Sequence, residues 1–266
     1  MRAETDGLRK RSGNDRAGKT AGMIGRDFTV GRVELLLLEF VFPFLLSNLL
    51  NSVYNTVDMV VIGHRMGSVG TVAVSMGGRM LTMFTHVSAS LCSGGQVLLA
   101  QQLGAGERKA LGRTIGTLFT LLAVVSVVVA AASFVLADPI LRLIRTPCEA
   151  LSSAEAYLRI TCIGLPFIFG YNAVCSVLRG MGDSKRPLLF IGIAAVINLV
   201  LDLIFILGLE MGAAGTALAT VVGQSVAFVL AVVQLYHRRD QFGFDFCPEN
   251  FRPQLAFARI ICRVGF

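Results

Sequence analysis

Six long apolar stretches constrain this chain more than any other feature. Hydrophobic residues make up 54% of the sequence and charged residues only 15%, a composition typical of membrane proteins. A helix needs about 20 residues to cross a hydrocarbon core about 30 Å thick, and each stretch is long enough. The sequence therefore predicts an all-α membrane protein, a bundle of six transmembrane helices. The expected spans are residues 35–62, 71–99, 114–137, 156–178, 187–208 and 212–236.

The distribution of Lys and Arg predicts the topology. Basic residues concentrate before the first span, in the loops after the second and fourth spans, and directly after the sixth. Short basic loops stay on the cytoplasmic side, so we expect a multi-pass protein of a bacterial-type plasma (inner) membrane with both ends in the cytoplasm. The net charge of +7 then reflects topology and contact with anionic membrane lipid. The sequence has no face of combined basic and aromatic residues, so nucleic-acid binding is not expected.

Three regions follow from this pattern. Residues 1–32 form a basic cytoplasmic tail that we expect to be partly disordered, and Met23 is an alternative start. Residues 33–237 form the six-span unit. Residues 238–266 are expected to form a cytoplasmic linker and the lead into a seventh span that is missing, so we interpret the chain as an amino-terminal fragment.

Polar residues at similar depths in three apolar spans predict one site. Asp202 lies six residues, about 9 Å, before the outer end of the fifth span, and Asp58 lies about 6 Å below the outer end of the first. Thr220 is about 12 Å into the sixth span. Asn198 is four residues before Asp202 and so shares its helix face.

The first span carries a polar stripe with the spacing of one helix face. Asn48, Asn51, Asn55 and Asp58 are 3, 4 and 3 residues apart. A central carboxylate facing lipid costs about 3 kcal/mol on insertion scales, so the stripe must face protein or water. The asparagines alone could equally hold helices together by hydrogen bonds.

Carboxyl groups in a membrane favour a functional interpretation, since amides would hold helices without the cost of ionisation. A carboxyl group in a low-dielectric cavity can hold a proton at neutral pH, or can bind a cation together with amide and hydroxyl oxygens. We therefore expect Asp58, Asn198, Asp202 and Thr220 to bind H+ or Na+. That is also the only metal site we expect.

Several segments resemble bacterial multidrug and toxic compound extrusion (MATE) transporters. The first span, within "DFTVGRVELLLLEFVFPFLLSNLLNSVYNTVDMVVIGHRMG", has a proline fifteen residues before "VD". Further segments follow in the family's order: "GGQVLLAQQLGAG", "AYLRITCIGLPF", "LRGMGDSKRP", "INLVLDLIF" and "GAAGTALATVVGQ". The resemblance covers about residues 27–236.

The resemblance implies a secondary antiporter that exports small organic, often cationic, drugs or toxic compounds in exchange for H+ or Na+. It implies one lobe of a two-lobe, MATE-type transporter, completed by a carboxy-terminal lobe or by a second copy of the chain. The family's coupling residues fall on Asp58, Asn198, Asp202 and Thr220, and its first-span proline falls on Pro43, where a missing backbone donor permits bending. No further cofactor is implied, and the protein is not expected to be an enzyme.

Other residues predict no additional chemistry. The six cysteines contain no CxxC pair and are interpreted as packing residues, not as disulfides or metal ligands. The sequence contains no GxxxxGK[ST] phosphate-binding loop, so nothing in it predicts the use of ATP. Arg79, in the second span, has no role in the family pattern; one hypothesis pairs it with Asp58, and another makes it a structural arginine that snorkels to the interface or faces the bundle.

Two rival functions remain. An intramembrane aspartyl protease also needs two aspartates, one within GxGD, and "GMGD" ends at Asp183. The neighbouring basic residues place Asp183 in a cytoplasmic loop, which disfavours this alternative. A flippase for lipid-linked oligosaccharides, from the same superfamily, typically has a more basic cavity, whereas the first, fifth and sixth spans have no basic residue.

Overall fold

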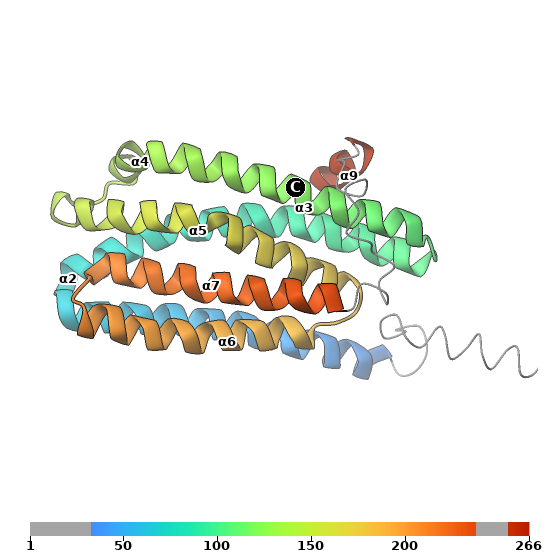
Figure 1. The fold of residues 1–266 in the computed structure, drawn as a ribbon, viewed down its shortest axis with the longest axis horizontal. Coiled ribbons are helices and arrows are strands. Elements are labelled where there is room, and N and C mark those ends of the chain that lie inside the picture. The colour runs from blue at the N-terminus through green and yellow to red at the C-terminus, as the bar shows by residue number, and fades with distance from the viewer. Residues whose placement is uncertain (1–32, 238–254, 266) are drawn as a thin grey trace, which may run out of the picture.

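The computed structural model describes residues 33–237 and 255–265, and all helix bounds below refer to that part of the chain. The described residues form helices and no strand, which confirms the all-α prediction. In chain order the elements are α2 (Val33–Gly104), α3 (Arg108–Val135), α4 (Ala137–Leu143), α5 (Cys148–Gly180), α6 (Lys185–Asp202), the π-helix η1 (Leu203–Gly208), α7 (Gly212–His237) and α9 (Leu255–Gly265) (Figure 1).

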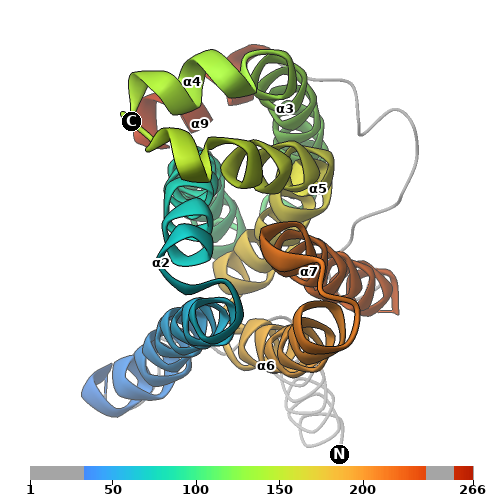
Figure 2. The ribbon, with the colours of Figure 1, turned by 90° about the vertical axis from the view of Figure 1, so that its left-hand side faces the viewer.

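The helix α2 contains both the first and the second expected span. Its backbone leaves helical geometry at Gly67, where φ is 61° and ψ is −145°. This left-handed region favours glycine, which has no Cβ to clash with the neighbouring carbonyl. The chain turns back there, so α2 has a first limb (33–66) and a second limb (68–104) that run along the bundle in opposite directions (Figures 1 and 2).

The most buried helix is α5, which packs against α2, α3 and α7. Glycines allow close approach at these contacts. A side chain at Gly164 would collide with Val221 of α7, and one at Gly95 of α2 would lie 2.8 Å from Leu118 of α3. Small residues at helix crossings are typical of membrane bundles, because they let the van der Waals surfaces of two backbones meet.

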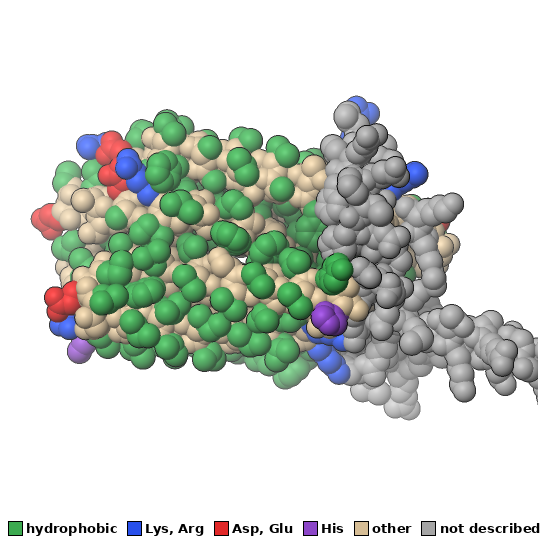
Figure 3. Space-filling model, viewed as in Figure 1, with side chains coloured by type: hydrophobic (Ala, Val, Ile, Leu, Met, Phe, Trp, Pro, Cys, Tyr) green, Lys and Arg blue, Asp and Glu red, His purple; other side chains and the backbone are tan. Residues whose placement is uncertain are grey.

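The surface of the bundle matches a membrane environment. Five of the described helices are long and apolar enough to cross a bilayer, and α2 is the one that doubles back. On the face shown in Figure 3, the sides of the helices are largely hydrophobic, and charged side chains gather towards the ends of the bundle. The helices overlap the six expected spans, although α3 begins six residues and α5 eight residues before the predicted limits.

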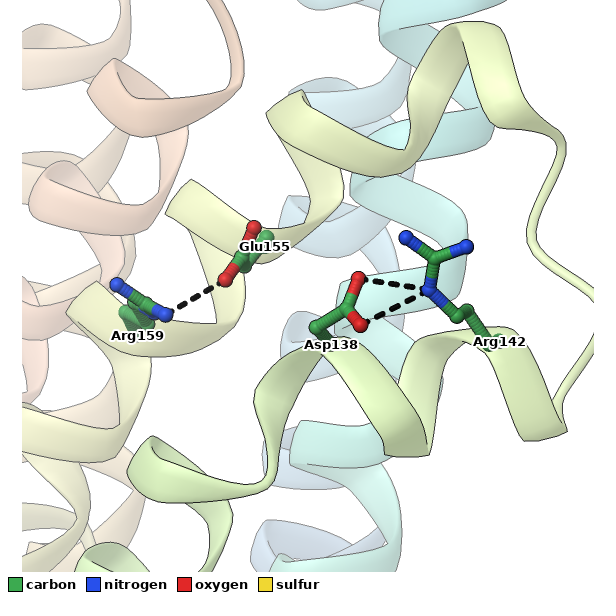
Figure 4. Close-up of polar contacts among 4 residues, drawn as sticks. All are labelled: Asp138, Arg142, Glu155 and Arg159. Carbon is green, nitrogen blue, oxygen red and sulfur yellow. Dashed lines mark hydrogen bonds and ion pairs between the residues drawn. The ribbon is translucent and has the colours of Figure 1, made fainter.

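A short helix that the sequence did not predict, α4 (Ala137–Leu143), follows α3 at the same end of the bundle as Gly67. Its Arg142 donates from Nε to both oxygens of Asp138 at 2.9 Å, and this carboxylate raises the pKa of Arg142 (Figure 4). On α5, Arg159 pairs with Glu155 at 2.6 Å and lies 5.5 Å from the ring centroid of Phe134. Arg142 and Arg159 therefore have partners within the chain.

The helix α9 packs on α2 and α3 rather than extending away from them. Ile261 is fully buried in the contact, and the backbone of α9 passes so close to Gly94 that a side chain at Gly94 would collide with the Ile261 carbonyl. The expected tail (1–32) and most of the expected linker (238–254) lie outside the described residues. The division into three regions therefore stays a prediction.

Candidate functional site

Four of the predicted site residues lie together between α2, α6 and α7. Asp58 comes from the first limb of α2, Asn198 and Asp202 from α6, and Thr220 from α7. Their exposed fractions are between 0% and 5%, although all four are polar. The three helices adjoin one another (Figure 2), so residues from distant parts of the sequence form one buried polar cluster.

Asn198 joins the three helices through its side-chain amide. Its nitrogen donates to Asp58 Oδ1 at 3.0 Å, and its oxygen accepts from the Thr220 backbone N–H at 3.2 Å. This orientation satisfies both ends of the amide; in the opposite one the nitrogen would reach only Thr220 Oγ1, at 3.5 Å. The Thr220 hydroxyl donates to the Thr216 carbonyl at 3.0 Å. Asn198 thus fixes the position of the Asp58 carboxyl group.

The two carboxyl groups adjoin each other, and Asp202 is left without a donor. Asp58 and Asp202 lie within side-chain hydrogen-bonding range. A hydrogen bond between them requires a proton on one of the two acids, since a carboxylate only accepts. Both oxygens of Asp202 are fully buried, and no described group donates to either of them. Two adjacent buried negative charges are costly, so the arrangement can bind a proton or a cation.

Three features near these residues were not predicted from the sequence. The chain forms a π-helix directly after Asp202, with Leu209 N–H donating to the Ile204 carbonyl at 3.0 Å. Gly223 lets α7 approach α6, because a Cβ there would lie 3.0 Å from the Ala194 carbonyl and 3.4 Å from Asn198 Cβ. Thr216, on α7, is fully buried, and its hydroxyl has no hydrogen-bond partner among the described residues. The glycine and the threonine fall on the inner face of the sixth span by helical spacing, whereas no sequence signal marks the π-helix.

A small cavity adjoins the cluster between α6 and α7. Its volume is about 190 Å³, which includes its opening, and it passes beside Asn198 and Thr220. The remaining lining residues are Ala194, Ala195, Gly223 and Gln224. The cavity gives the buried polar cluster a neighbouring space that is partly open.

The other predicted residues of the first span lie elsewhere. Pro43 is buried, and its carbonyl accepts from the Ser47 hydroxyl at 2.8 Å. Asn51 is half-buried, and Asn48 and Asn55 are exposed, so the structure does not bring these three into the cluster.

The hypothesis that Arg79 pairs with Asp58 is wrong. No ion pair joins the two residues: Arg79 is exposed on the second limb of α2, and its guanidinium donates to Met76 Sδ at 3.9 Å. Asp58 instead faces α6, where Asn198 and Asp202 are its neighbours.

The residues that suggested other chemistry have structural surroundings. Asp183 lies in the turn before α6, where it accepts from the Arg186 backbone N–H at 3.3 Å and pairs with the Arg186 side chain at 2.7 Å. It therefore acts at a helix start, away from the other two aspartates. In the described part of the chain, the cysteines are free, and no three His, Cys, Asp or Glu residues are grouped as metal ligands.

Comparison with known proteins gives a consistent result. Residues 43–204 match the family model MatE. The chain is 36% identical over 203 residues to the probable multidrug resistance protein YpnP of Bacillus subtilis (strain 168), covering 76% of this chain and 46% of that protein. It is 33% identical over 210 residues to the probable multidrug resistance protein YoeA of the same strain, covering 77% and 45%.

A solved structure shows the same fold. The crystal structure of a MATE protein in the bent conformation superposes with a TM-score of 0.82 at 24% identity, covering 88% of this chain and 52% of that one. The chain thus spans about half the length of the curated relatives it matches.

Proposed function

Because the chain belongs to the MatE family, we propose that it forms the amino-terminal lobe of a secondary antiporter that exports small organic compounds. The two similar Bacillus subtilis proteins are named as probable multidrug resistance proteins, which supports an efflux role. Exchange for H+ or Na+ would supply the energy. No step in this process makes or breaks a covalent bond, and no cofactor besides the coupling ion is needed.

The buried cluster of Asp58, Asn198, Asp202 and Thr220 is the observation that carries this proposal. The two adjoining carboxyl groups of Asp58 and Asp202 need a proton or a cation. Asn198, on α6, bonds to Asp58 on α2 and to Thr220 on α7, so it connects all three helices. Binding or release of one positive charge changes the force between the first limb of α2 and α6. An ion that binds two arrangements of these helices with different affinity shifts the population between them.

The small organic substrate would pass beside this lobe rather than through its core. The chain spans about half the length of its relatives, so a second lobe is the partner that we propose for the passage; a second copy of this chain is the alternative. Bending of the first limb at Pro43, whose nitrogen has no hydrogen to donate, would let that limb move relative to α6.

The protein is a multi-pass membrane protein. The position of its basic side chains supports one orientation of the bundle in the membrane. Lys185 and Arg186 begin α6, directly after its turn from α5. We place this end of the bundle in the cytoplasm of a bacterial-type plasma membrane, with Gly67 and α4 at the outer side, because basic loops are retained inside. The family match does not favour the oligosaccharide flippase, and the position of Asp183 does not favour the protease.

Efflux of a fluorescent organic cation tests the proposal. Cells that lack their own efflux pumps would express this lobe together with the second lobe proposed above, be loaded with dye while de-energised, and then be re-energised. Asp202→Asn keeps the shape of the side chain but removes the acid. We expect wild-type cells to lose dye and Asp202→Asn cells to retain it, because the variant cannot exchange the coupling ion.

The matched control is Asp138→Asn, which makes the same chemical change in the exposed pair with Arg142. This variant should export dye at the wild-type rate. Immunodetection of each variant in the membrane fraction excludes a loss of insertion. Undiminished, gradient-dependent efflux by Asp202→Asn would remove Asp202 from the mechanism.

A further inference from the structure

Arg79 places a positive charge deep in the second limb of α2. It follows Gly67, where the chain turns back, by twelve residues, which is about 18 Å along the helix. Its side chain is exposed, and its guanidinium donates to Met76 Sδ at 3.9 Å. A charge at this depth is costly against hydrocarbon, so the exposed face around Arg79 must border water or polar groups.

No described acid pairs with Arg79. Among the described side chains of α2 the only acid is Asp58, which is buried and bonded to Asn198. A thioether is a weak acceptor, so the contact with Met76 leaves the other N–H donors of the guanidinium available. Four other arginines each lie within 3.5 Å of a carboxylate oxygen: Arg65, Arg142, Arg159 and Arg186.

The surface around Arg79 has the composition of a site for a small organic compound. Thr82 and His86 are three and seven positions further along the same helix face, and both are exposed. The apolar side chains of Met83 and Val87 are exposed beside them. Sites for small molecules generally combine apolar surface with a few polar groups that set orientation and specificity. Arg79 supplies the permanent charge in this set, because a guanidinium is not deprotonated in proteins.

We propose that Arg79 is a specificity residue that binds the carboxylate of transported organic compounds. The inference rests on the proposed function and names a class of substrate: small organic molecules with a carboxylate, zwitterions included. The planar guanidinium fits the two oxygens of a carboxylate through two parallel hydrogen bonds. An organic cation without a carboxylate gains nothing from this contact, so its export does not depend on Arg79. An acid of the second lobe is the competing partner, and it would give Arg79 a structural role that is the same for every substrate.

A pair of rhodamine dyes tests the inference. One dye has a free carboxylate and is a zwitterion, and the other is its methyl ester, a cation of nearly the same size. Cells that express both lobes would be loaded with each dye to the same initial fluorescence and then re-energised. We expect the wild type to export both dyes. Arg79→Gln keeps a polar side chain but removes the charge. It should slow export of the carboxylate dye about tenfold or more, the usual effect of losing a hydrogen bond to a charged group, and leave export of the ester unchanged.

Arg113→Gln is the matched control. Arg113 is also exposed, and no acid in the described part of the chain pairs with it, but it lies near the start of α3. This variant should export both dyes at the wild-type rates. Arg79→Lys keeps the charge but loses the planar fork, so its export of the carboxylate dye should fall between the wild type and Arg79→Gln.

Equal slowing of both dyes in Arg79→Gln would overturn the inference, because it would assign Arg79 to the fold or to a contact with the second lobe. Unchanged export of the carboxylate dye by Arg79→Gln would also overturn it, as would a wild type that exports only the ester. A wild type that exports neither dye would contradict the proposed function itself, and the inference with it. Export of the ester by the wild type therefore separates the two failures.

Discussion

At the scale of single residues, the cluster has a stability cost. Asp202 is fully buried beside a second acid, and no described group donates to its oxygens. Residues that serve function often reduce stability, because the folded state must hold them in unfavourable surroundings. Here the cost is expected to be relieved whenever a proton or cation is bound.

Asp202→Asn should therefore stabilise the folded chain in the absence of Na+. The amide can donate to Asp58 and carries no charge, so we expect the free energy of unfolding to rise by about 1 to 3 kcal/mol, as seen when uncompensated buried charges are replaced. Chemical denaturation in mixed lipid and detergent micelles would measure it, with Asp138→Asn showing little change. A clear loss of stability in Asp202→Asn would mean that the carboxylate has a structural partner.

At the scale of helices, the approach of α6 to α7 depends on a glycine. Gly223→Val would place side-chain atoms against the Ala194 carbonyl, which the α6 backbone cannot easily move. Overpacking of this kind costs about 1 to 3 kcal/mol, and it should also separate Asn198 from Thr220. The expected result is a lower unfolding temperature together with weaker ion binding.

Gly192 on α6 provides the control for this prediction. A Cβ at Gly192 meets no atom within 4 Å. Gly192→Ala should therefore keep ion binding and raise the free energy of unfolding by up to about 1 kcal/mol, the usual gain in a helix interior. Equal effects of the two substitutions would show that close packing at Gly223 does not matter.

How much of this could be predicted from the sequence depends on the range of the interaction. Apolar length predicted the helices, and depth together with helical phase selected the four residues that the structure brings together; their role stays a prediction. The same reasoning grouped Asn48 and Asn55 with Asp58, but these side chains point to the surface. Sequence spacing gives the direction of a side chain around its helix only to within roughly one quarter of a turn. The packing of α6 against α2 decides which residues of the polar face are buried.

Other features had no local signal. In the π-helix after Asp202, each backbone hydrogen bond spans one residue more than in an α-helix. This change lies within an uninterrupted apolar run, so hydropathy cannot reveal it. The pairing of Arg79 with Asp58 failed because it relied on depth alone. Arg79 comes from the second limb of α2, where its side chain is exposed and contacts Met76, whereas Asp58 is buried against α6.

At the scale of the whole molecule, the second limb of α2 presents a polar stripe to the outside of the lobe. Its residues are 4, 3, 4, 4 and 3 positions apart, which keeps them on one helix face. Hydroxyls, an arginine and a histidine are costly against hydrocarbon, so this face must border water or a second lobe. The members of the stripe are Ser75, Arg79, Thr82, His86, Ser90 and Ser93, all half-buried or exposed.

Thiol labelling tests this assignment. In a chain whose native cysteines are replaced, Thr82→Cys and Ser93→Cys, both at exposed positions of the stripe, should react with a membrane-impermeant maleimide in lipid vesicles. Val124→Cys and Val128→Cys, on α3, are controls with 57% and 61% exposure but apolar surroundings, and they should stay unlabelled in lipid. Labelling of all four positions, or only of the two on α3, would contradict a water-lined stripe.

Coupling between the acid cluster and the movement of an organic compound is the central claim, and reversed coupling tests it most directly. In vesicles reconstituted with the protein, an imposed gradient of the organic dye should drive H+ or Na+ in the opposite direction, because linkage between two ligands is reciprocal. Lumenal indicators for pH and Na+ would record this movement. We predict ion flux with wild type and with Asp138→Asn, and none with Asp202→Asn. Dye-driven ion flux at the wild-type rate in Asp202→Asn would contradict the account.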